Sequence, residues 1–92
     1  MTVEWTDEAL KSLAEIHFYI SEESPTAADR TIRRLFARVE QLDSFPLSGR
    51  IVPEFAADQV RELIEAPYRV WYRVLPAGAQ VLAVVHGARD VR

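Results

Sequence analysis

The segment Arg69-Val70-Trp71-Tyr72-Arg73-Val74 decides the fold of this chain. Successive side chains of a strand point to opposite faces, so its apolar face carries Val70, Tyr72 and Val74. The other face carries Arg69, Trp71 and Arg73. A strand with one apolar face requires a second layer to cover that face. We expect the arginine-bearing face to stay open to solvent.

Two amphipathic helices upstream are predicted to supply the covering layer. Thr6 is a suitable N-cap, followed by two acidic residues, for a helix from about Asp7 to Ser21. Ser24-Pro25 starts a second helix, because proline is tolerated in the first helical turn, and Phe45-Pro46 ends it. The apolar stripes are Leu10, Leu13, Ile16 or His17, and Ile20 in the first helix, and Ala28, Ile32, Leu35, Val39 and Leu42 in the second. The two form an antiparallel helix hairpin.

Strand-like sequence flanks the helices. Thr2 to Trp5 alternates polar and apolar residues, and Arg50 to Val52 is a short strand that Pro53 stops or confines to an edge. Three further strands are predicted at Val60 to Glu65, Arg69 to Leu75 and Gln80 to Gly87, the last two joined through Pro76-Ala77-Gly78. The prediction is one α+β domain over residues 1–92, of order β-α-α-β-β-β. Its N-terminal helix hairpin packs on one face of a mostly antiparallel sheet.

The composition is that of an ordinary globular domain. The 92 residues are 49% hydrophobic and 27% charged, which suffices for one core and no more. Cysteine is absent, so neither a disulfide nor a thiolate metal site is possible, which fits the cytoplasm. The longest apolar run, Val81 to Val85, is far shorter than the roughly 18 residues of a membrane helix. We expect no cofactor, no metal and no membrane contact.

The net charge of −3 hides an uneven distribution. Residues 1–29 hold one lysine and seven acids, whereas residues 30–92 hold ten arginines, seven acids and no lysine. Arginine offers a planar fork of donors that suits phosphate and carboxylate, so an arginine-only basic half favours specific contacts. A GC-rich genome that encodes arginine in place of lysine would produce the same bias, and both explanations stay open.

Five short motifs occur in a fixed order along the chain. They are Ser24-Pro25, Pro46-Leu47-Ser48-Gly49-Arg50, Arg61-Glu62-Leu63, Tyr68-Arg69-Val70-Trp71-Tyr72 and His86-Gly87-Ala88-Arg89-Asp90. In this order and spacing they resemble the ParE/RelE superfamily of bacterial type II toxins. The resemblance implies a toxin that a cognate antitoxin neutralises by wrapping around it. It also implies two modes of action, because RelE-like members cleave messenger RNA on the ribosome and ParE-like members poison DNA gyrase.

The nuclease alternative rests on three residues. By resemblance, Arg69 and Arg89 match the phosphate-binding arginines of RelE-like enzymes, and His86 is the one plausible base near them. Such enzymes usually carry further basic residues or a tyrosine after the last strand, whereas this sequence ends at Arg92. They are also strongly basic and have a lysine-rich strand edge, whereas this chain has a net charge of −3 and lacks such an edge. The ParE-like mode is therefore favoured, with a metal-independent endoribonuclease or a non-toxic antitoxin-binding relative as alternatives.

The residues predicted to bind the target or the antitoxin are Arg61, Arg69, Trp71, Arg73 and Arg89, because arginine and tryptophan dominate protein interfaces. The predicted partners are the antitoxin and DNA gyrase, or the ribosome and its messenger RNA in the alternative. A homodimer or a toxin-antitoxin hetero-oligomer is compatible with the sequence. Purely structural roles stay open: Arg69 and Arg73 can pair with Glu62 or Glu65 across strands, and His86 can be a hydrogen-bonded structural residue.

Overall fold

The order of elements confirms the predicted α+β fold. The computed structural model describes residues 2–55 and 59–87. Its elements are β1 (Thr2–Trp5), α1 (Asp7–Ser21), α2 (Pro25–Ser44), β2 (Arg50–Ile51), β3 (Val60–Glu65), β4 (Tyr68–Leu75) and β5 (Gly78–His86). The short strand expected near Arg50 joins the sheet as β2, so the sheet has one strand more than the predicted order counts. Among the described helices, neither combines the length and apolar character needed to cross a membrane.

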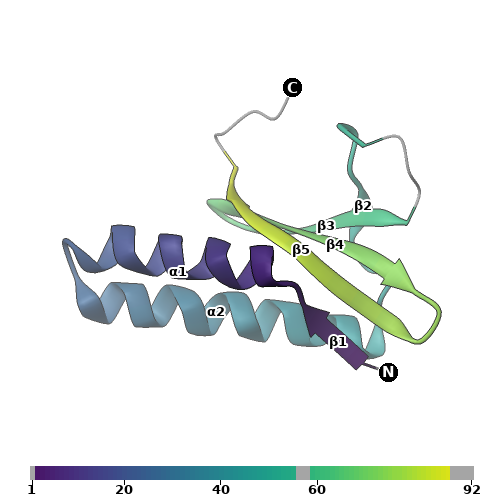
Figure 1. Ribbon diagram of the computed structural model, residues 1–92, viewed down its shortest axis with the longest axis horizontal. Coiled ribbons are helices and arrows are strands. Elements are labelled where there is room, and N and C mark those ends of the chain that lie inside the picture. The colour runs from purple at the N-terminus through teal and green to yellow at the C-terminus, as the bar shows by residue number, and fades with distance from the viewer. Residues whose placement is uncertain (1, 56–58, 88–92) are drawn as a thin grey trace.

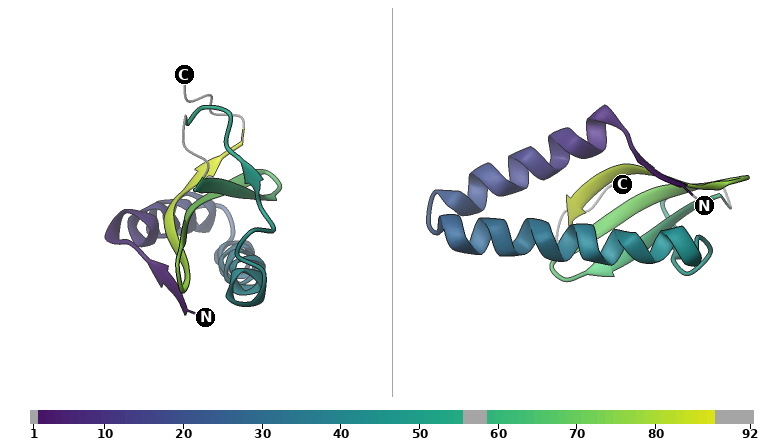
Figure 2. Two further views of the ribbon diagram at one scale, coloured as in Figure 1. Left: turned by 90° about the vertical axis from the view of Figure 1, so that its right-hand side faces the viewer. Right: turned by 90° about the horizontal axis from the view of Figure 1, so that it is seen from below.

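Both helices begin where the sequence predicts. The Thr6 hydroxyl accepts a hydrogen bond from the backbone N–H of Ala9 at 3.0 Å, and the Ser24 hydroxyl accepts one from that of Ala27 at 3.1 Å. These caps satisfy backbone donors that have no partner within the helix. α1 and α2 then run antiparallel on the same side of the sheet, as Figure 1 and the view from below in Figure 2 show.

The sheet joins the two ends of the described chain. Its strand order is β1-β5-β4-β3-β2, in which β1 is parallel to β5 and the other pairs are antiparallel. The Thr6 hydroxyl also donates to the carbonyl oxygen of Val81 at 3.0 Å, which fixes the start of α1 to β5. The predicted β4–β5 hairpin is confirmed, and its turn is tighter than expected because Leu75 pairs directly with Gly78.

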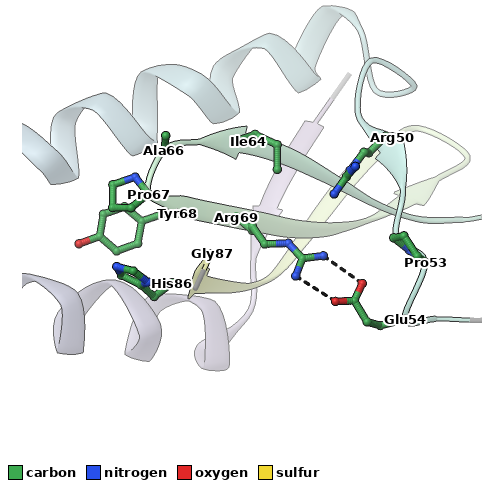
Figure 3. A pocket seen from close by; sticks show the side chains of 10 residues that line it. All are labelled: Arg50, Pro53, Glu54, Ile64, Ala66, Pro67, Tyr68, Arg69, His86 and Gly87. Atoms are coloured by element: carbon green, nitrogen blue, oxygen red, sulfur yellow. Dashed lines mark hydrogen bonds and ion pairs between the residues drawn. The ribbon is translucent and has the colours of Figure 1, made fainter. Parts of the chain in front are cut away.

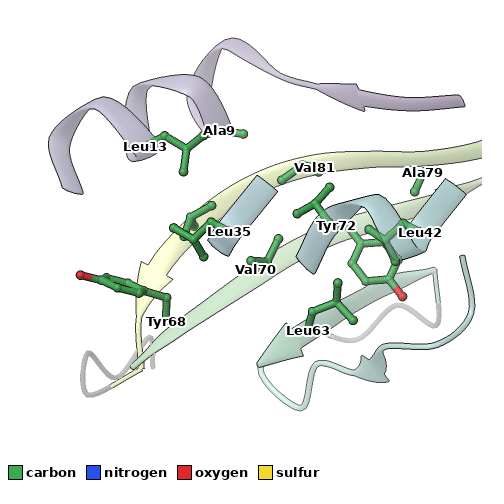
Figure 4. Close-up of a cluster of buried hydrophobic side chains, with 12 residues drawn as sticks. Ala9, Leu13, Leu35, Leu42, Leu63, Tyr68, Val70, Tyr72, Ala79 and Val81 are labelled. Atoms are coloured by element: carbon green, nitrogen blue, oxygen red, sulfur yellow. The ribbon is translucent and has the colours of Figure 1, made fainter. Parts of the chain in front are cut away.

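The main core lies between the helices and the sheet (Figure 1). Leu35 and Leu42 of α2 face Val70 and Tyr72 of β4 in Figure 4, so the face of β4 predicted to be covered is confirmed. In α1 the predicted stripe is wrong at one position. Leu10 is 47% exposed, and the neighbouring Ala9 is buried in its place. The Thr6 hydroxyl fixes the start of α1 to β5, and the helix is turned so that Ala9 and not Leu10 faces the core.

Tyr72 anchors the loop that leads from α2 to β2. Its ring is fully buried, and its hydroxyl donates to the carbonyl oxygen of Pro46 at 2.7 Å. The same hydroxyl accepts a hydrogen bond from the Gly49 N–H at 2.9 Å. A Cβ atom at Gly49 would lie 2.6 Å from the Tyr72 hydroxyl oxygen, so only glycine permits this approach. Burial raises the pKa of Tyr72, so the hydroxyl keeps its proton.

Removing this hydroxyl should destabilise the fold. We expect Tyr72→Phe to lower the free energy of unfolding by about 1–2 kcal/mol, because the Gly49 N–H loses its partner in a buried place. Urea denaturation followed by circular dichroism measures the difference. Tyr19→Phe is the matched control, since Tyr19 is 76% exposed and should tolerate the change. Equal losses in the two variants would contradict the anchoring role.

Candidate functional site

A polar cluster lies on the sheet face opposite the helices. Strand alternation places Glu62 of β3 and Arg69 and Trp71 of β4 on this outer face, and the sheet register sets Glu62 opposite Trp71. Arg50 reaches the cluster from β2, where it pairs with Glu62. The segment after β2 passes on this same side of the sheet (Figure 1) and adds Glu54.

Glu62 is the buried centre of the cluster. The residue is 1% exposed, and its carboxylate accepts hydrogen bonds from Arg69 Nε at 2.6 Å and from Trp71 Nε1 at 3.1 Å. Arg50 also donates to it. Burial alone would raise the pKa of Glu62, but the hydrogen bonds from the two arginines and from Trp71 outweigh burial and lower it. The carboxylate is therefore charged at neutral pH, and its hydrogen bonds are made with Arg50, Arg69 and Trp71 of the same protein.

Arg69 is held by two carboxylates. Its Nη1 and Nη2 atoms each donate to one carboxylate oxygen of Glu54 at 3.0 Å, while its Nε binds Glu62. Its guanidinium also lies over the ring of Trp71, 5.2 Å from the ring centroid. The hydrogen bonds that Arg69 donates to both carboxylates, first to Glu54, raise the pKa of Arg69, and the same bond lowers the pKa of Glu54. The charge of Arg69 is thus already neutralised.

The expectation of an open arginine face is wrong for two of its three residues. The side chain of Arg69 is 11% exposed, and Trp71 is 7% exposed. Trp71 packs with Val52 and Val60, and Phe55 meets its ring edge-on at a centroid distance of 5.1 Å. The segment after β2 causes this burial because it folds back over the outer face.

The remaining predicted binding residues do not gather around Arg69. Arg73 is exposed on the outer face and forms no ion pair with any other described residue. Arg61 alternates to the opposite face, where its Nη1 donates to the carbonyl oxygen of Gly49 at 2.9 Å and so supports the loop that Tyr72 anchors. Arg89 lies outside the described residues.

A shallow hollow of about 650 Å³ opens beside the cluster, at the end of the outer face (Figure 3). Its lining is Arg50, Pro53, Glu54, Ile64, Ala66, Pro67, Tyr68, Arg69, His86 and Gly87. His86 is exposed and meets the ring of Tyr68 edge-on at a centroid distance of 5.6 Å. In Figure 3 the guanidinium of Arg69 extends toward Glu54, whereas His86 lies beside Tyr68 at the other end of the hollow.

This geometry limits the chemistry that the hollow can perform. Metal-independent RNA cleavage needs a base near the attacking hydroxyl and unpaired cations at the scissile phosphate. Here the fork of Arg69 is filled by Glu54 and points away from His86. Within residues 2–55 and 59–87, no three His, Asp or Glu side chains come together as metal ligands. The arrangement is suited to binding another molecule.

Sequence reasoning missed two members of the cluster, Glu54 and Arg50. The pairing of Arg69 with Glu62 was foreseen as one of the structural alternatives, and it is confirmed. No sequence pattern pointed to Glu54, because its contact with Arg69 depends on how the chain turns after Pro53. The short β2 strand could have pointed to Arg50, since an edge strand beside β3 brings this residue next to Glu62.

The known proteins to which this chain is similar are toxins. A family model described as the ParE toxin of the type II toxin-antitoxin system parDE matches residues 3–91. Putative toxin Y4kP of Sinorhizobium fredii is 36% identical over 86 residues, covering 91% of this chain and 85% of the relative. Toxin RelE2 of Caulobacter vibrioides is 35% identical over 88 residues, covering 95% and 96% respectively.

A solved structure shows the same fold. It is described as a chromosomal ParDE TA system from P. aeruginosa, and it matches with a TM-score of 0.76 over 94% of this chain and 95% of that chain. The sequence identity is 24%, so this likeness concerns the fold alone.

Proposed function

Because the chain belongs to the ParE toxin family of type II toxin-antitoxin systems, whose model it matches over residues 3–91, we propose that it arrests growth by binding and poisoning DNA gyrase. A cognate antitoxin neutralises it. The protein acts as a binding partner of the enzyme and catalyses no reaction of its own.

The state of Arg69 is the observation that carries this proposal. A nuclease of this superfamily would need Arg69 to grip phosphate, yet the guanidinium is bound by Glu54 and Glu62 and covered by the segment after β2. While Glu54 is bound, two carboxylates surround Arg69 and repel an approaching phosphate. When Glu54 rotates away, Glu62 still pairs with Arg69 and Arg50, which leaves fewer unpaired cations than an anionic transition state needs. Within the two modes of action of the superfamily, this supports the binding mode.

The outer face also has the composition of a protein interface. Phe55 and Ile64 expose apolar surface there, and Arg73 adds an exposed cation on the same face. Aromatic, aliphatic and arginine side chains in one place are typical of protein interfaces, in which a few anchors dominate the binding free energy.

A supercoiling assay tests the proposal directly. Purified toxin is added to DNA gyrase, relaxed plasmid and ATP, and the reaction is stopped with detergent and protease. We expect linear plasmid to accumulate, because a poison traps the cleaved gyrase–DNA complex. Adding the cognate antitoxin first should prevent this. Unchanged supercoiling at micromolar toxin would refute gyrase as the target.

Arg73 is the residue of the outer face best placed to contact the target. We expect Arg73→Ala to raise the toxin concentration needed for half-maximal gyrase poisoning by about tenfold, which is typical for loss of an interface arginine. Stability should be unchanged, because Arg73 forms no ion pair within the described residues. The matched control is Arg30→Ala on the exposed side of α2, which should leave the gyrase titration unchanged. If both variants weakened gyrase poisoning equally, the loss would come from the overall charge of the toxin and not from a contact of Arg73.

Ribosome-dependent cleavage remains the second candidate, because Arg69, Tyr68 and His86 line the same hollow. Primer extension on translated messages would then show codon-phased cuts that vanish in Arg89→Ala. A chain that binds only its antitoxin would cause no growth arrest on overexpression. These two readouts separate the alternatives from gyrase poisoning.

A further inference from the structure

The outer edge of Arg69 has the geometry of a carboxylate receptor. Its two terminal nitrogens hold the two oxygens of Glu54 side by side, each at 3.0 Å. We propose that this fork receives an acidic side chain of the cognate antitoxin, and that Glu54 fills it as an internal substitute in the free toxin. The inference rests on membership of the toxin family and is independent of which target the toxin attacks.

The fork is held rigidly from behind. Arg69 Nε binds the buried Glu62 at 2.6 Å, and its guanidinium face lies over Trp71. Glu62 is itself fixed by Trp71 Nε1 and by Arg50. The guanidinium therefore keeps its position and direction whether or not Glu54 is bound. A planar fork fixed in this way binds a carboxylate through two parallel, charge-assisted hydrogen bonds.

Glu54 is held far more weakly than the fork. Its side chain is partly exposed, and among the described side chains it hydrogen-bonds with Arg69 alone. It can leave by rotating about its own side-chain torsions, with β3 and β4 unchanged. Its departure would leave Arg50 and Arg69 against Glu62, a local charge of +1 that attracts another anion.

The surroundings of the fork favour a protein segment as the source of that anion. The adjoining hollow is walled by apolar groups of Ile64, Ala66 and Pro67 and by the ring of Tyr68. A segment with an acidic side chain beside an apolar one would fill the fork and the hollow together. An RNA backbone would need several unpaired cations in a row, whereas Arg50 in the same wall is already bound to Glu62.

Glu54 then competes with the antitoxin for Arg69. The apparent affinity of a ligand is the intrinsic affinity multiplied by the fraction of molecules whose site is free, so removing the internal competitor should tighten binding. If Glu54 fills the fork about four-fifths of the time, as a partly exposed charge pair of this kind can, the gain on its removal is about fivefold.

The test uses a fluorescent peptide of alternating glutamate and leucine, with a uridine RNA of equal charge as the second probe, at low ionic strength. Glu54→Gln should bind the peptide about fivefold more tightly than the natural chain. The matched control, Glu15→Gln, makes the same change of net charge at an exposed position of α1 that has no ion pair within the described residues. It should change the affinity less than twofold. Adding Arg69→Lys to Glu54→Gln should abolish the gain, because lysine keeps the charge and lacks the fork.

Three results would overturn the inference. An equal gain in Glu15→Gln would reduce the effect to overall charge. A larger gain for the RNA than for the peptide would assign the fork to phosphate. Undiminished peptide binding to toxin already saturated with its purified antitoxin would show that the antitoxin leaves the fork empty. None of these results depends on the gyrase assay, so the two proposals can fail separately.

Discussion

Glu62→Ala is expected to lower the free energy of unfolding by about 3–5 kcal/mol, the usual cost of removing one partner from a buried ion pair. The carboxylate is the shared acceptor of Arg50, Arg69 and Trp71, so its loss leaves Arg69 Nε and the Trp71 indole N–H without their acceptor under the covering segment, and the exposed Arg50 without its partner. Urea denaturation followed by circular dichroism measures the change. Near-ultraviolet signals of Trp71 should weaken in parallel, because its indole N–H loses its fixed partner.

Two further variants define this effect. Glu15→Ala removes an exposed carboxylate from a helix, and it should change stability by no more than about 0.5 kcal/mol. Glu62→Gln keeps the size of the side chain and one acceptor oxygen, so it should lie between the two. A loss below about 1 kcal/mol for Glu62→Ala would mean that the cluster is no stronger than an exposed pair.

Gly78→Val is expected to cost at least about 3 kcal/mol and to detach β1 from the sheet. A Cβ atom at Gly78 would lie 1.9 Å from the carbonyl oxygen of Thr2, and the glycine has a φ of +156°. Neither the contact nor the backbone angle suits a β-branched residue. Denaturation measures the loss, and hydrogen exchange of the β1 amides reports the detachment.

The control for this prediction lies in the same turn. Ala77 is exposed next to Gly78, and Ala77→Ser should leave both stability and β1 protection unchanged. Slow exchange of the β1 amides in Gly78→Val would contradict the prediction, because it would show that β1 still pairs with β5.

The sequence predicts the parts of this fold that depend on neighbouring residues. Thr6 and Ser24 cap the helices through bonds to residues only three positions away, so both starts could be predicted. Strand alternation likewise assigned Val70 and Tyr72 to the covered face. The choice between Ala9 and Leu10 was missed, because the rotation of α1 depends on the distant contact of Thr6 with β5.

Both the residues of the candidate site and their arrangement were predicted only in part. Arg69, Trp71 and Arg73 do share the outer face, as the alternation requires. The sequence carried no sign that the chain after Pro53 covers this face, so the burial of Trp71 and the pairing of Arg69 with Glu54 were unexpected. Both depend on a turn between elements, where local preferences do not determine the path of the chain.

The pairing of β1 with β5 has a consequence for how the protein is made. β1 leaves the ribosome before the helices, yet its partner residues, Gly78 to Val81, are synthesised after the helices and after β2, β3 and β4. The helix hairpin can form as it emerges, because its contacts are local, whereas the sheet must wait for a contact between distant parts of the chain. A message translated only as far as residue 77 therefore yields no complete sheet. The complete sheet therefore forms only after β5 has been synthesised, even though the helix hairpin can form earlier.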